Sequence, residues 1–139
     1  YKRQEQGVPL VEALCDRLKV PNQFRELAVI VTRYHLRYHR AAEMRNDTFL
    51  ETLEKLDAFR RPKRFEQFLI ACEADSRGRT GFEDSEFNQP KIFHEAFAAA
   101  TTIDAKTFID QGLQGTDIAD AIKKARIKAI KRARKPYLP

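Results

Sequence analysis

Two histidines four residues apart offer the chemistry of a metal or phosphate ligand. His35 and His39 lie in a segment whose apolar residues recur at helical spacing, so the two rings stand one turn apart on a helix. Such a pair can share a metal ion or a phosphate. A histidine beside tyrosines is also typical of a buried residue with satisfied hydrogen bonds. Both interpretations stay open for His35, which the helical spacing places on a face with Phe24, Val31 and Tyr38.

A second group of charged side chains follows within one short segment. Its members are Asp75, Arg77, Arg79 and Glu83. Two carboxylates and two guanidinium groups this close could perform acid–base chemistry or bind a phosphate. Gly78 and Gly81 in the same segment permit positive φ, which favours a loop. We therefore expect these charges to pair with one another or to hold the loop, with contact to an RNA backbone as a further role.

The net charge of +6 is concentrated at the end of the chain. Residues 1–122 carry 18 basic and 20 acidic side chains, whereas residues 123–139 carry 8 basic and no acidic ones. Four of these lysines recur at spacings of four, three and four on a helical pattern, and they are Lys124, Lys128, Lys131 and Lys135. A rise of 1.5 Å per residue separates neighbours by about 4.5 to 6 Å, close to the phosphate spacing of an RNA strand.

This lysine ridge predicts binding to an RNA backbone without reading of bases. On another side of the same helical pattern lies an apolar stripe, which consists of Ile118, Ile122, Ala125, Ala129 and Ala133. A lysine-rich helix that serves only solubility is the alternative. Binding to a membrane surface is disfavoured, because the stripe is mostly alanine rather than Trp, Phe or Leu.

A smaller basic cluster surrounds Pro62 at a junction between two helical patterns. Arg60, Arg61, Lys63 and Arg64 form this cluster. Such a corner is either solvated or a phosphate contact, and we name Arg60, Arg61 and Arg64 as candidate RNA-binding residues.

The spacing of apolar residues indicates helices along nearly the whole chain, and these helices must position the charged residues. Apolar spacings of three and four run through residues 8–19, 22–40, 48–59, 63–75, 90–101, 105–111 and 117–134. The sequence thus predicts an all-α fold of about seven helices with no sheet.

No apolar run approaches the roughly 20 residues of a membrane span. Cys15 and Cys72 stand apart among apolar neighbours, so we expect buried thiols and a cytoplasmic protein without a membrane partner.

Several short motifs together resemble the carboxyl-terminal part of the bacterial CCA-adding enzymes, which are tRNA nucleotidyltransferases. These motifs are Val20-Pro21-Asn22, the run from Glu73 to Glu83, and Gly112-Leu113-Gln114-Gly115. The resemblance implies a helical part that holds tRNA while C, C and A are added from CTP and ATP. It places magnesium, both nucleotides and the catalytic carboxylates in an amino-terminal nucleotidyltransferase head that is missing here. No catalytic residue is assigned in this chain, which we expect to be inactive alone and to carry no bound cofactor.

The same resemblance extends to the HD domain, a metal-dependent phosphohydrolase module that some of these enzymes carry. The segment from Tyr34 to His39 is similar to its downstream histidine segment, which implies a partial metal site at His35 and His39. This sequence has no His-Asp dyad, however. Half of an HD phosphohydrolase and a non-catalytic helical scaffold therefore remain the alternative functions.

We expect residues 1–76 to form a helical body, and residues 77–139 to form a loop and tail packed with it as one unit.

Overall fold

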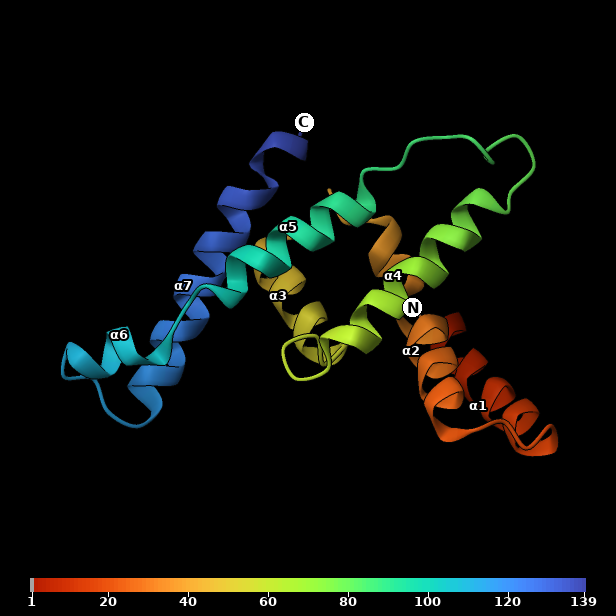
Figure 1. Ribbon diagram of the computed structural model, residues 1–139, viewed down its shortest axis with the longest axis horizontal. Coiled ribbons are helices and arrows are strands. Elements are labelled where there is room, and N and C mark those ends of the chain that lie inside the picture. Colours follow the sequence, from red (N-terminus) through yellow and green to blue (C-terminus); the bar gives the residue numbers. More distant parts are fainter. Residues whose placement is uncertain (1) are drawn as a thin grey trace. The chain divides into compact units, whose positions relative to one another are not determined.

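The computed structural model describes residues 2–139, which form helices joined by connections, the longest of which runs from α4 to α5 (Figure 1). The helices in chain order are α1 (Lys2–Arg17), α2 (Asn22–His39), α3 (Asn46–Lys55), α4 (Pro62–Arg77), α5 (Gln89–Thr101), α6 (Ala105–Asp110), α7 (Thr116–Arg134) and the short 3₁₀ helix η1 (Lys135–Tyr137). No strand occurs within residues 2–139. The predicted all-α class is confirmed.

Local chemistry explains where several helices begin. Pro62 occupies the first position of α4, where its missing N–H costs nothing and its fixed φ suits a helix. Asp104 caps α6, because its side chain accepts a hydrogen bond from the backbone N–H of Lys106 at 3.0 Å. Gly112 and Gly115 have φ of +89° and +57°, and they turn the chain between α6 and α7. These boundaries agree closely with the helical spacing of the sequence.

The first helix begins earlier than predicted. The apolar spacing indicated a start near residue 8, but α1 begins at Lys2 and continues through Pro9. A proline inside a helix removes one backbone hydrogen bond, so packing must support this turn. Gly7 allows α1 to approach α2 closely, since a Cβ at this position would lie 3.0 Å from Cγ2 of Thr32. The missing side chain of Gly7 thus permits the first turns of α1 to pack closely on α2.

The first of two compact units contains α1, α2 and α4. It comprises the chain up to Arg40 together with Leu56–Phe87. Helix α2 packs on α1 and on α4, and the ring of Tyr38 meets that of Phe68 edge to face at 6.4 Å between centroids. The side chains buried in this unit include Cys15, Ile30, Tyr34, Phe65, Leu69 and Cys72.

The second unit contains α3, α5, α6, α7 and η1. It comprises Ala41–Lys55 together with Asn88–Pro139. Helix α7 is its centre, because α3, α5 and α6 all pack against it. Phe49 of α3 lies 4.7 Å from Phe93 of α5 between ring centroids, and Ile130 of α7 is fully buried. The predicted grouping into residues 1–76 and 77–139 is a different division of the chain and stays a prediction.

Candidate nucleic-acid interface

The predicted lysine ridge lies on the exposed side of α7 and continues into η1. Lys124, Lys128, Lys131 and Lys135 are all exposed to solvent. Within the part of the chain that the structure describes, none of the four forms an ion pair with a carboxylate. Their ammonium groups are therefore available to an outside anion. The exposure of the ridge is confirmed, whereas its contact with RNA stays a prediction.

Three of these lysines border an open hollow on the surface of the second unit. The residues that line it are Lys128, Lys131, Arg132, Lys135 and Leu138. Four cations and no carboxylate surround this hollow, so its potential is positive. Arg132 was not among the predicted RNA-binding residues. The signal was present, because Lys128, Lys131, Arg132 and Lys135 follow the i, i+3, i+4, i+7 pattern of one helix face.

The buried side of α7 differs from the predicted apolar stripe. The stripe residues are only half-buried, and they are Ile118, Ile122, Ala125, Ala129 and Ala133. The most deeply buried residues of α7 are instead Ile130 and Arg134, at 0% and 1% exposure. The burial of Arg134 was not predicted, because the basic residues 123–139 were expected to be solvent-exposed or RNA-binding.

Arg134 joins the end of α7 to the turn that precedes α3. Its guanidinium donates to the side-chain oxygen of Asn46 at 2.6 Å and to the carbonyl oxygens of Ala41 and Met44 at 2.7 and 2.6 Å. The same group lies 4.8 Å from the centre of the Phe49 ring. Burial removes the Arg134 guanidinium from water and so lowers its pKa, and none of these acceptors carries a negative charge that would offset this effect. Arg134 is a structural residue and not part of the exposed ridge.

The basic cluster at the start of α4 is partly neutralised. Arg60 pairs with Asp57 at 2.7 Å, and Arg61 pairs with Glu26 at 3.0 Å. Arg64 lies 3.6 Å from the same Glu26 carboxylate and is mostly buried, with 15% of its side chain exposed. Exposure of Arg60 and Arg61 leaves both with further N–H donors for a ligand. Their RNA-binding role stays a prediction.

His35 and His39 of α2 stand one turn apart, as the spacing required. Their ring centroids are 6.3 Å apart, and both rings are half-buried. Nδ1 of His35 lies 3.0 Å from the carbonyl oxygen of Val31, a hydrogen bond within the helix. Nε2 of His39 lies 3.4 Å from a carboxylate oxygen of Asp75, and its Nδ1 lies 3.5 Å from the hydroxyl of Ser76.

No metal centre is apparent from the groups that the structure describes. Among residues 2–139, no three or more His, Cys, Asp or Glu side chains gather closely enough to hold a metal ion. The partial metal site at His35 and His39 stays a prediction. Phe24, which the spacing placed on the same face of α2 as His35, is 56% exposed, so this end of the face is largely uncovered.

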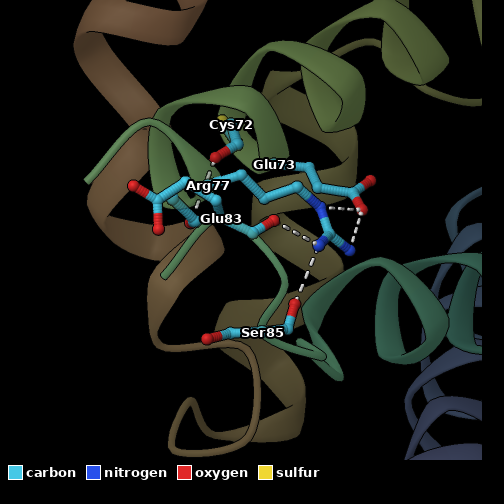
Figure 2. Close-up of polar contacts among 6 residues, drawn as sticks. Cys72, Glu73, Arg77, Glu83 and Ser85 are labelled. Carbon is cyan, nitrogen blue, oxygen red and sulfur yellow. Dashed lines mark hydrogen bonds and ion pairs between the residues drawn. The ribbon is translucent and has the colours of Figure 1, made fainter. Parts of the chain in front are cut away.

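The charged segment after α4 is organised around Arg77. Figure 2 shows its guanidinium between the Glu73 carboxylate, at 3.0 and 3.1 Å, and the carbonyl oxygens of Glu83 and Ser85, at 3.3 and 2.8 Å. The guanidinium also lies 5.7 Å from the centre of the Phe87 ring. Arg77 therefore holds the loop against the end of its own helix. This confirms the structural interpretation of the loop charges for Arg77.

Both cysteines are free and buried, as predicted. Burial raises the pKa of the Cys72 thiol to about 12, with a smaller contribution from the negative charge of Asp75. Such a thiol stays protonated at neutral pH and is a poor nucleophile. Cys72 is thus a packing residue of the first unit.

None of the described helices combines the length and apolar character that crossing a membrane requires. This agrees with the sequence, in which charged residues interrupt every apolar run.

Comparison with known proteins gives one consistent result. The chain is 50% identical over 131 residues to the multifunctional CCA protein of Thioalkalivibrio sulfidiphilus, a match that covers 94% of this chain and 32% of the relative. It is 48% identical over 134 residues to that of Alkalilimnicola ehrlichii, with 96% of this chain and 32% of the relative covered. For Nitrosococcus oceani the identity is 50% over 133 residues, with coverage of 96% and 33%.

No protein-family model and no solved structure matches the chain significantly. The similarity to the named proteins extends over nearly the whole chain, which confirms the resemblance seen in its short motifs. The chain spans about a third of the length of these relatives. This protein is thus related, over almost all of its sequence, to one third of a multifunctional CCA protein.

Proposed function

We propose that this chain is the tRNA-binding helical portion of a CCA-adding enzyme. In the intact enzyme, C, C and A are added to tRNA 3′ ends from CTP and ATP with magnesium in a nucleotidyltransferase head. The helical portion holds the acceptor stem and elbow of the tRNA so that the growing 3′ end reaches that head. The chain itself performs no chemistry in this scheme, and its role is to bind and position RNA.

The exposed ridge of α7 is the observation that carries the proposal. Four lysines follow one another on the exposed side of a helix without carboxylate partners in the described structure. An ammonium group is a point charge that suits phosphate oxygens, and a row of them follows a phosphate backbone without reading bases. The relatives, which are named multifunctional CCA proteins, make tRNA the nucleic acid to test first.

Salt-dependent tRNA binding tests the proposal. Each phosphate contact releases bound counterions, so affinity should fall steeply as salt rises and should depend little on base sequence. Lys128→Glu with Lys131→Glu should weaken binding at low salt and flatten the salt slope by roughly one unit or less per lost contact. Both side chains are exposed, so the fold should survive, as circular dichroism would verify.

A matched variant controls for the change in net charge. Lys91→Glu with Lys106→Glu removes the same charge from exposed positions of the same unit but outside the ridge. This control should keep most of the affinity and the original salt slope. If the ridge variant and the control bind tRNA equally well, the ridge is only a solvated surface and the proposal loses its support.

Half of an HD-type phosphohydrolase site remains a second candidate. The position of His39 beside Asp75 favours it, since these residues come from different helices and lie 3.4 Å apart. His35 would be a further ligand one turn away. Isothermal titration calorimetry with Mn²⁺ or Zn²⁺ tests this function. Stoichiometric metal binding that His39→Ala abolishes would support it. Equally weak metal binding by the unaltered chain and by His39→Ala would exclude it.

A further inference from the structure

A hollow at the start of α4 has the lining of an anion site. Its residues are Gln23, Arg60, Arg61, Pro62, Lys63, Arg64 and Gln67. Four of them are cationic, two carry amides, and none is a carboxylate. The cations come from the connection before α4 and its first turn, whereas Gln23 comes from the first turn of α2. The hollow lies within the first unit, and the α7 ridge belongs to the second.

The acidic partners of this cluster do not cancel its charge. Asp57 and Glu26 pair with Arg60, Arg61 and Arg64, but neither carboxylate lines the hollow. Four cations and two carboxylates leave an excess of two positive charges. Among the described residues, Lys63 forms no ion pair. Its ammonium group and the remaining guanidinium N–H groups of the exposed Arg60 and Arg61 are available to a ligand.

The same ion pairs hold the arginines in place. Glu26 connects Arg61 and Arg64, and Nη2 of Arg64 donates to the carbonyl oxygen of Leu56 at 3.3 Å. Nε of Arg64 is buried and has no hydrogen-bond acceptor. Fixed guanidinium groups bind phosphate at a lower entropic cost than mobile ones, because their donors are already oriented. Amide side chains such as those of Gln23 and Gln67 can donate to the remaining phosphate oxygens.

We propose that this hollow is a second phosphate-binding site, separate from the α7 ridge, which takes one phosphate group of an RNA. This inference rests on the proposed function, and it assigns Lys63, Gln23 and Gln67 to RNA binding in addition to the three arginines. The group is either a phosphodiester of the backbone or the terminal phosphate of a 5′ end. Both offer the same anionic oxygens, so the experiment must distinguish them.

The test uses nuclear magnetic resonance of the ¹⁵N-labelled chain, in which the arginine Nε–H signals report on the hollow directly. Three probes are titrated: an RNA hairpin with a 5′ phosphate, the same hairpin with a 5′ hydroxyl, and inorganic phosphate. Equal shifts of the Arg60, Arg61 and Arg64 signals with both hairpins assign a backbone phosphodiester. Shifts with the phosphorylated hairpin alone assign the terminal phosphate.

The remaining outcomes separate this inference from the proposed function. If the hairpins shift backbone signals of α7 but leave the three arginines unchanged, the hollow is not a phosphate site and the function stands. If inorganic phosphate shifts the arginines while neither hairpin shifts any signal, the hollow binds free phosphate but no RNA, and both the RNA-binding function and this inference fail. If no probe shifts any signal, both proposals fail.

A pair of substitutions provides an independent measurement. Arg61→Gln with Lys63→Gln removes two charges from the hollow, while Arg64 remains as a partner for Glu26. We expect RNA affinity to fall about three- to tenfold at low salt, with a salt slope lower by roughly one to two units. Lys2→Gln with Arg3→Gln on the exposed part of α1 is the matched control and should change neither. Equal affinities of the two variants would overturn the site.

Discussion

The guanidinium of Arg134 stacks on the ring of Phe49 at 4.8 Å, although 85 residues separate them in the sequence. The guanidinium also donates to Asn46 and to two carbonyl groups of the preceding turn, so every acceptor comes from one short segment. The last turn of α7 therefore fixes the entry into α3. This contact orients the helix that carries the lysine ridge within the second unit.

Removal of this guanidinium should destabilise the protein strongly. Arg134→Met keeps much of the apolar stem but leaves buried acceptors without a donor, so the free energy of unfolding should fall by about 2 to 4 kcal/mol. Urea denaturation followed by circular dichroism measures this change. Arg132→Met, which alters an exposed neighbour, should change stability by less than about 0.5 kcal/mol. Similar losses for both variants would contradict the structural role of Arg134.

Replacement of Arg77 should release the loop that follows α4. Arg77→Met removes the hydrogen bonds to Glu83 and Ser85, so the backbone of residues 78–87 should exchange amide hydrogens faster and be cleaved sooner by protease. Hydrogen exchange followed by mass spectrometry localises the effect. Arg79→Met, at an exposed position in the same segment, should leave exchange unchanged. Unaltered protection in Arg77→Met would show that other contacts hold the loop.

Stability should fall in alkaline solution. Burial raises the pKa of Cys72 from its ordinary value of 9.0 to about 12, and burial likewise raises the pKa of Tyr38. The folded state therefore holds these protons more tightly than the unfolded state, so their contribution is complete below pH 9 and is lost as pH rises toward 12. Urea midpoints at pH 8, 9.5 and 10.5 measure the trend. Cys72→Ala should reduce the slope above pH 9, and an unchanged slope would exclude Cys72 as a cause.

The isolated chain should not extend tRNA. Incubation with tRNA that lacks its CCA end, CTP, ATP and magnesium should give no longer product, because the residues described here provide no cluster of carboxylates to hold metal ions for nucleotidyl transfer. Gel electrophoresis of labelled tRNA detects a single added nucleotide, and a full-length multifunctional CCA protein is the reference for a working assay. Metal-dependent extension by the purified chain would overturn this prediction.

The sequence predicted the helices well and the packing less well. Helical spacing located most of the helices, and Pro62 marked the junction at the start of α4, because these signals act over only a few residues. The exposure of the lysine ridge followed from the same local periodicity. The burial of Arg134 did not, since its acceptors lie about 90 residues earlier in the chain. Periodicity likewise placed Phe24 on a packed face, but whether such a face is covered depends on neighbouring helices.

The interleaving of the two units has a consequence for fragment complementation. Helix α3 precedes the loop around Gly81 in the sequence, yet it packs against α7, which follows that loop. A single cut at Gly81 would yield one piece with α1 to α4 and another with α5 to η1. Each piece would carry part of the core of the second unit: the first piece would contain Phe49, and the second piece would contain Phe93. The two pieces should therefore reassociate when mixed, and a gene divided at this loop should still produce a folded protein.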